Sequence, residues 1–70
     1  MDNYHGEKMA EIHLRYNRCQ TLTDEECIAL RDWLKQTYEY NLSMEHRINA
    51  VYFGSQYESL DKVCESRHIK

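Results

Sequence analysis

Apolar residues recur along this chain with the spacing of helices rather than of strands. Between residues 24 and 40 they follow steps of three and four, the period of one buried helical stripe. The stripe consists of Cys27, Leu30, Leu34 and Tyr38, widened on one side by Trp33. The chain has no proline and only two glycines, so the turn residues that punctuate a β-rich chain are missing. The sequence therefore predicts an all-α protein.

The stretch TLTDEEC, residues 21–27, marks the start of this helix. Thr23 and Glu26 have the spacing of a capping box, in which each side chain accepts a hydrogen bond from the backbone amide of the other residue. Leu22 before the cap and Cys27 in the first turns have the spacing of a hydrophobic staple. The three consecutive acids also complement the positive end of the helix dipole. We therefore predict a helix over residues 24–40.

Two further helices flank it. Met9, Ile12, Tyr16 and Cys19 share one helical stripe, which predicts a short first helix over residues 7–19. After residue 40, Ser43 is a favourable N-cap for a third helix over residues 44–65, followed by a frayed tail at 66–70. The resulting prediction is a short N-terminal helix plus an antiparallel helical hairpin.

The apolar stripe of the third helix changes phase beside Gly54. The first half presents Ile48, Val51 and Tyr52, whereas the second half presents a stripe displaced by about 140°, at about 100° per residue. The second stripe consists of Phe53, Tyr57, Leu60 and Cys64. Because glycine costs about 1 kcal/mol inside a helix, the helix either bends there or stays continuous and buries two faces. The second alternative suits a hairpin that dimerises.

The size and charge of the chain narrow the range of possible functions and partners. Seventy residues predict a single small domain near the lower limit of independent stability, so we expect a homodimer or a subunit of a small complex. No apolar run approaches the roughly 20 residues of a membrane span and no signal peptide is evident, so we expect a cytoplasmic protein. The formal charge of −3 argues against general affinity for nucleic acid and favours a protein partner with a basic or mixed surface.

The candidate reactive groups do not form a recognisable catalytic or metal-binding motif. The three cysteines are odd in number and far apart in sequence, so we expect reduced thiols. Cys27 follows three acids, which disfavour its thiolate. Cys64 and His68 are four residues apart, but their surroundings have no compact zinc-finger spacing. We predict no enzymatic activity, no cofactor and no bound metal.

Two short resemblances are present. The runs RCQT (18–21), YNLS (40–43) and AVYF (50–53) resemble, in the same order, segments of the Hha family of small helical proteins, which modulate nucleoid-associated proteins. The runs are spaced further apart here than in that family. Separately, Ser55-Gln56 and Leu60-Asp61 resemble an interrupted signature of small sporulation phosphatases that act on aspartyl phosphate. We assign the chain to neither family.

The aromatic residues indicate how the protein works. Six aromatic side chains lie in the second and third predicted helices, more than one hairpin interior needs, although Trp33 and Phe53 also suit a core. Tyrosine is enriched at interfaces because it supplies a large area and a hydroxyl group. The predicted partner-binding residues are Trp33, Tyr40, Tyr52 and Tyr57, with Glu39 and Glu58 as a charged rim. We expect an acidic, non-enzymatic regulator or inhibitor that acts by protein-protein interaction, with its small size suggesting a phage or bacterial origin.

The alternative is a DNA-associated modulator of transcription or of a nucleoid protein. Its phosphate contacts would come from Arg15, Arg18, Arg31 and Lys35. The first turn of the second helix would have to enter the DNA groove, and its three acids would be repelled there. Direct nucleic acid binding is therefore the less favoured expectation.

Overall fold

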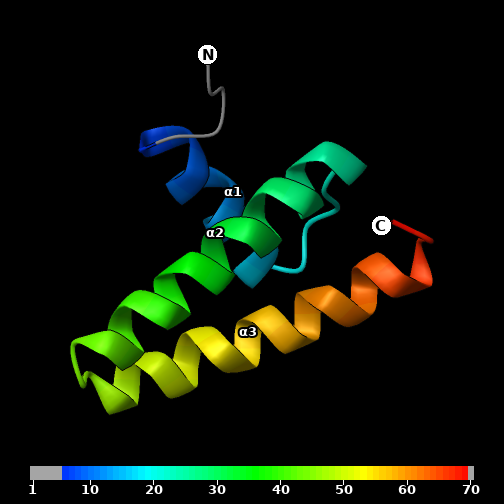
Figure 1. Cartoon of the computed structure of the whole chain (residues 1–70). Coiled ribbons are helices and arrows are strands. Elements are labelled where there is room, and N and C mark those ends of the chain that lie inside the picture. Colours follow the sequence, from blue (N-terminus) through cyan, green and yellow to red (C-terminus); the bar gives the residue numbers. More distant parts are fainter. Residues whose placement is uncertain (1–5, 70) are drawn as a thin grey trace.

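The computed structural model describes residues 6–69, which form three helices and no strand (Figure 1). The helices are α1 (Glu7–Asn17), α2 (Asp24–Ser43) and α3 (Arg47–Ser66). α2 and α3 run antiparallel side by side, and α1 lies against α2 (Figure 1). The all-α prediction and the α2–α3 hairpin are confirmed.

The predicted start of α2 is confirmed in detail. The Thr23 amide donates to Oε1 of Glu26 at 2.9 Å, and the Glu26 amide donates to Oγ1 of Thr23 at 3.1 Å. Leu22 and Cys27 are both buried and belong to the same core cluster. These local contacts fix the residue at which α2 begins and the direction from which the chain enters it.

The core lies between the three helices. α1 contributes Met9 and Ile12, α2 contributes mainly Leu30 and Leu34, and α3 contributes Leu60 and Cys64. Most positions of the predicted stripes are therefore buried or half-buried. Cys19 is an exception, because α1 ends at Asn17 rather than at residue 19 and Cys19 is exposed with a φ of 58°.

The turn between α2 and α3 differs from the prediction. Ser43 does not cap α3; it ends α2, and its hydroxyl donates back to the Tyr40 carbonyl at 2.9 Å. Buried Asn41 likewise donates to the Thr37 carbonyl at 2.7 Å, so both polar residues prolong α2 beyond residue 40. Glu45 reverses the chain with a φ of 61°, and His46 precedes the first turn of α3. α3 therefore begins at Arg47 rather than at residue 44.

α3 runs unbroken through Gly54, which lies against α2. A Cβ atom at Gly54 would lie 2.9 Å from a ring carbon of Tyr38, closer than side chains normally approach. Glycine at this position therefore permits the two helices to pack closely.

The two predicted stripes of α3 have different surroundings. Leu60 and Cys64 are fully buried, and Phe53 and Tyr57 are half-buried against the core. The first-half stripe faces away from the core: Ile48 is 87% exposed, Val51 68% and Tyr52 47%. Among the described residues α3 thus buries one apolar face and leaves the other uncovered.

The end of α3 is tied back to the start of α2. Arg67 Nη1 donates to the Leu22 carbonyl at 2.7 Å and lies 3.3 Å from Oδ1 of Asp24. Ile69 packs against the core cluster. Of the predicted frayed tail, residues 67–69 therefore lie beside the hairpin, and residue 70 is outside the described residues.

Candidate protein-binding groove

The structure does not bring all the sequence-predicted binding residues together. Trp33 and Tyr52 line one groove between α1 and the hairpin. Tyr40 is exposed near the end of α2, whereas Tyr57 is half-buried against the core. Glu39 and Glu58 are exposed but do not line the groove. The fold thus brings two of the predicted aromatic residues together and places the other predicted residues elsewhere.

We call this depression the α1 groove. It has a volume of about 530 Å³, within the size range of ligand-binding clefts. Its lining residues are Gly6, Met9, Ala10, His13, Leu14, Asn17, Trp33 and Tyr52. Buried Met9 belongs to the core, while Leu14 and Tyr52 are about half exposed. The groove therefore offers partly exposed apolar side chains from α1 and α3 over a packed base.

Aromatic packing holds the base of the groove. The rings of His13 and Trp33 are 5.2 Å apart between centroids, and those of Trp33 and Phe53 are 5.8 Å apart in an edge-to-face arrangement. Tyr52 meets Phe53 edge-on at 5.0 Å. Such pairs typically contribute about 0.5–1.5 kcal/mol beyond their buried area. The ring cluster joins all three helices and restricts the movement of Trp33 and Tyr52.

A chain of hydrogen bonds fixes the polar side of the groove. Nε2 of His13 is hydrogen-bonded to Oε1 of Gln56, whose amide oxygen can only accept. The other end of the Gln56 amide donates to Oδ1 of Asn17 at 2.7 Å and to the Tyr52 hydroxyl at 3.2 Å. Gln56 thereby joins α1 to α3 and orients the Tyr52 ring. These hydrogen bonds hold α1 and α3 together beside the groove.

Sequence reasoning missed Leu14, His13 and Gln56. Leu14 lies off the buried stripe of α1. The sequence marks it only as an apolar residue on the side of the helix where polar residues are expected. The His13–Gln56 contact joins residues 43 positions apart, and no local pattern encodes it.

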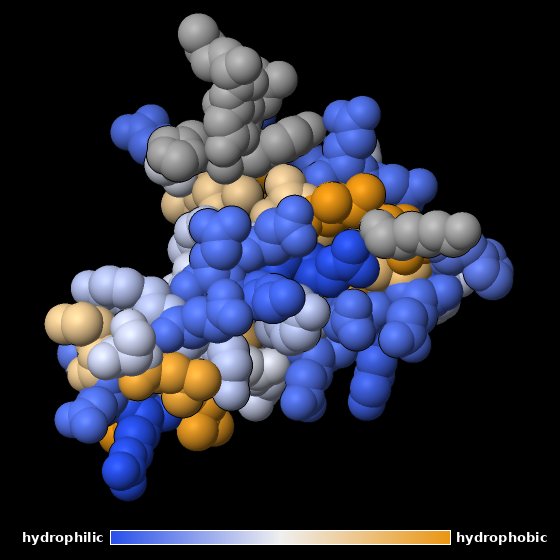
Figure 2. Space-filling model, in the orientation of Figure 1, coloured by the Kyte–Doolittle hydropathy of each residue, from blue (hydrophilic) through white to orange (hydrophobic). Residues whose placement is uncertain are grey.

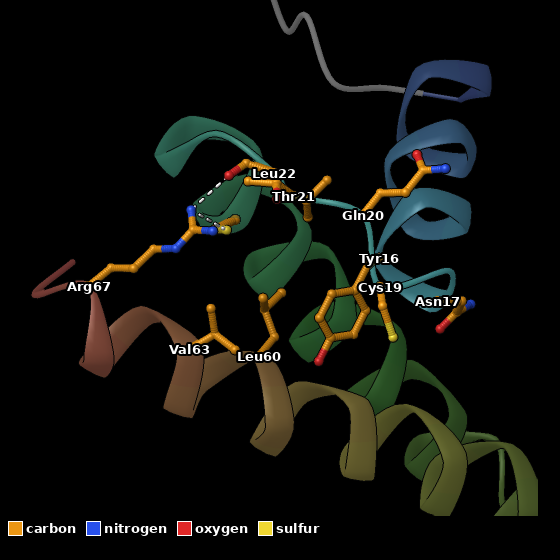
Figure 3. Close-up of a pocket in the computed structure, with 10 residues that line it drawn as sticks. Tyr16, Asn17, Cys19, Gln20, Thr21, Leu22, Leu60, Val63 and Arg67 are labelled. Atoms are coloured by element: carbon orange, nitrogen blue, oxygen red, sulfur yellow. Dashed lines mark hydrogen bonds between the residues drawn. The ribbon is translucent and has the colours of Figure 1, made fainter.

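A second depression lies where the α1–α2 connection meets the end of α3 (Figure 3). It has a volume of about 430 Å³, and its lining includes Cys19, Cys27 and Arg67. Nη1 of Arg67 is 3.4 Å from Sγ of Cys27, yet burial raises the pKa of the Cys27 thiol. A thiol held in its protonated form is a weak nucleophile, so burial disfavours nucleophilic chemistry at Cys27.

The four basic residues of the DNA-binding alternative do not form one cationic face. Arg15 is ion-paired with Glu26, and Nη1 of Arg31 lies 3.5 Å from Oδ1 of Asp61. Arg18, directly after the end of α1, and Lys35 of α2 are both exposed. Ion pairing of this kind reduces the positive potential available to phosphate groups.

Two further observations concern metals and membranes. Within residues 6–69, no three His, Cys, Asp or Glu side chains lie close enough together to hold a metal ion. None of the three described helices combines the length and apolar composition needed to cross a bilayer.

Comparison of the chain with protein-family models, with curated proteins and with solved structures finds no significant match. The description of the α1 groove therefore rests on the geometry of its own residues.

Proposed function

We propose that this protein is a small acidic regulator or inhibitor that acts by binding another protein and carries out no enzymatic step. The observation that carries the proposal is the α1 groove, in which Trp33 and Tyr52 come together beside half-exposed Leu14. Interface hot spots are enriched in tryptophan and tyrosine and lie in well-packed depressions. The proposed binding residues are thus Trp33 and Tyr52, which the sequence indicated, together with Leu14.

The shape and chemistry of the groove suit the apolar side of an amphipathic helix. Helix-in-groove recognition uses a hydrophobic depression between helices that accepts side chains spaced three and four apart. The α1 groove is bounded by α1 on one side and by the hairpin on the other. Because the aromatic cluster and Gln56 already hold its walls, the partner helix would bind without extensive rearrangement of the groove.

Charge favours a partner helix with basic flanks. Glu7 precedes Leu14 by two helical turns and lies on the same side of α1. Glu11 follows Glu7 by one turn and continues this acidic edge, and both residues are exposed. With a chain charge of −3, these acids would attract a basic segment and speed its association.

The test uses two matched leucines. Leu14 lies in the groove and is 48% exposed, whereas Leu42 lies near the α2–α3 turn and is 50% exposed. We expect Leu14→Glu to weaken capture of a partner protein from lysate of the source organism by about tenfold or more, and Leu42→Glu to leave it unchanged. Circular dichroism of both variants checks that the helices remain.

Two outcomes would overturn this proposal. One is a captured protein that binds Leu14→Glu as tightly as the parent. The other is binding of the parent to random duplex DNA with an affinity that falls steeply as salt rises, which would favour the DNA-associated alternative.

A further inference from the structure

The outer face of α3 is a second apolar surface, separate from the base of the α1 groove. We define it as Ile48, Val51, Ser55 and Ser59, which follow the i, i+3, i+7, i+11 spacing of one helical side. All four residues are exposed, Ile48 to 87% and Val51 to 68%. Figure 2 shows hydrophobic side chains gathered at the end of the molecule where α2 turns into α3. No described part of the chain covers this face, because it lies opposite the side of α3 that packs on α2.

We infer that this outer face binds a second copy of the same chain, with the two α3 helices antiparallel about a two-fold axis near Tyr52 and Phe53. Ile48 and Val51 of one copy would then lie on one side of the axis, and the same two residues of the second copy would lie on the other side. The short side chains of Ser55 and Ser59 let the helix axes approach closely at the seam. A two-fold axis makes such a contact self-complementary, since each residue pair occurs twice.

Charge along one edge of the face selects the antiparallel arrangement. Arg47 and Glu58 are about three helical turns apart and therefore lie on the same edge of α3. Reversing one helix about the proposed axis places Arg47 beside Glu58 of the second copy, and the symmetry repeats this pair. In a parallel two-fold arrangement the same edge of the two helices lies on opposite sides of the seam, so Arg47 and Glu58 of the two copies could not pair. Both residues are exposed, and neither forms an ion pair with another residue of the described chain.

The charge balance around this end also suits self-association. Residues 47–59, which span the proposed contact, contain one base, Arg47, and one acid, Glu58, so their formal charge is zero. The net charge of −3 therefore comes from the rest of the chain, and two copies meet here without strong mutual repulsion.

The size of the contact indicates how tight the dimer is. The two exposed apolar side chains of this face, Ile48 and Val51, supply on the order of 200 Å² per copy at roughly 100 Å² each. A standard stable interface buries about 800 Å² per partner. The apolar part of this face is much smaller, so we expect a weak dimer that dissociates in the high micromolar range rather than an obligate one.

Sedimentation equilibrium of the full chain tests the inference. Between about 1 and 300 μM, concentrations that span a micromolar dissociation constant, the mass is expected to rise from 8.5 kDa toward twice that value. Ile48→Glu should keep the chain monomeric throughout while circular dichroism stays unchanged, since Ile48 is outside the core. A parent chain that stays at 8.5 kDa, or an Ile48→Glu variant that dimerises normally, would overturn the inference.

Charge reversal tests the orientation of the helices. Arg47→Glu and Glu58→Arg should each weaken dimerisation by about tenfold, because each creates two like-charge contacts. The double variant should restore the parental dissociation constant, since the pairs re-form with reversed signs. If the double variant instead dimerises more weakly than either single variant, the antiparallel pairing is contradicted.

The inference does not depend on the proposed function, and one variant separates them. Leu14→Glu is expected to dimerise like the parent, because Leu14 lies on α1 and outside the outer face of α3. A loss of dimerisation in Leu14→Glu would assign self-association to the α1 groove and overturn the inference.

Discussion

The Glu26 carboxylate takes part in two stabilising contacts at once. It accepts from the Thr23 amide in the capping box and is ion-paired with Arg15 of α1. The hydrogen bond from the Thr23 backbone, followed by the contacts with Arg15, holds the pKa of Glu26 below its ordinary value despite partial burial. Because the folded-state pKa is depressed, the stabilisation is complete above the ordinary glutamate pKa of about 4.3 and is lost as pH falls through the folded value.

We predict that Glu26→Gln lowers the free energy of unfolding at pH 7 by roughly 1–2 kcal/mol. Glutamine still accepts from the Thr23 amide, so the change isolates the charge. Urea unfolding at a series of pH values should show the difference shrinking as pH falls below the ordinary glutamate pKa of about 4.3, and vanishing once the folded carboxyl is protonated. Glu25→Gln, which removes an exposed acid from the same turn, is the control and should change stability by less than about 0.5 kcal/mol.

At the scale of single elements, Gly54 is where helix propensity and packing conflict. Alanine is favoured over glycine by about 1 kcal/mol inside a helix, but a Cβ here would lie 2.9–3.0 Å from the Tyr38 ring. We predict that Gly54→Ala alone destabilises the protein by about 1 kcal/mol, because Tyr38 must shift within its packed surroundings. In a Tyr38→Ala background the same change should be stabilising.

The double-mutant cycle over Gly54 and Tyr38 is measured by urea unfolding. A coupling free energy above about 1 kcal/mol is expected, because the two residues are in direct contact. Ser55→Ala, at an exposed neighbouring position on α3, serves as the control for helix propensity. Additive effects of the two changes would mean that the Gly54–Tyr38 contact does not limit the approach of α2 and α3.

The helix boundaries show which signals in the sequence are sufficient. The start of α2 was predictable because Thr23 and Glu26 satisfy each other locally, within four residues. The end of α2 was not, because the Asn41 amide nitrogen and the Ser43 hydroxyl donate back to carbonyls of α2, and neither residue caps α3; the Asn41 amide oxygen instead lies 3.3 Å from Nδ1 of His46. The reversal itself uses Glu45 at positive φ, a conformation that glycine or asparagine would have signalled.

At the scale of the whole molecule, the sequence indicated which aromatic residues could bind a partner but not where the fold would place them. Trp33 and Tyr52 were predicted as binding residues, and the fold places them on one groove. Which other residues join them depends on where α1 crosses the hairpin, and that follows from long-range contacts such as Arg15–Glu26 and His13–Gln56. Likewise, the apolar residues Ile48 and Val51 were apparent in sequence, but an apolar stripe does not specify what covers it.

α1 is expected to be the least stable of the three helices. It has 11 residues against 20 in each of the others, and no side chain caps its N-terminus. Short helices owe most of their stability to packing, and α1 is held by Met9 and Ile12 in the core together with the Gln56 hydrogen bonds. Local opening of α1 would remove one wall of the α1 groove, so its stability bears directly on the proposed binding.

Native-state hydrogen exchange measures this local stability. We predict that α1 amides exchange faster than those of α2 and α3, and that Gln56→Ala speeds exchange in α1 by about fivefold or more, as expected for the loss of about 1 kcal/mol of hydrogen bonding. Exchange in the core segments of α2 should change little. Ser59→Ala, an exposed change on the same helix, should leave α1 as in the parent. If Gln56→Ala instead speeds exchange equally in all three helices, α1 and the hairpin unfold together, and the groove is as stable as the core itself.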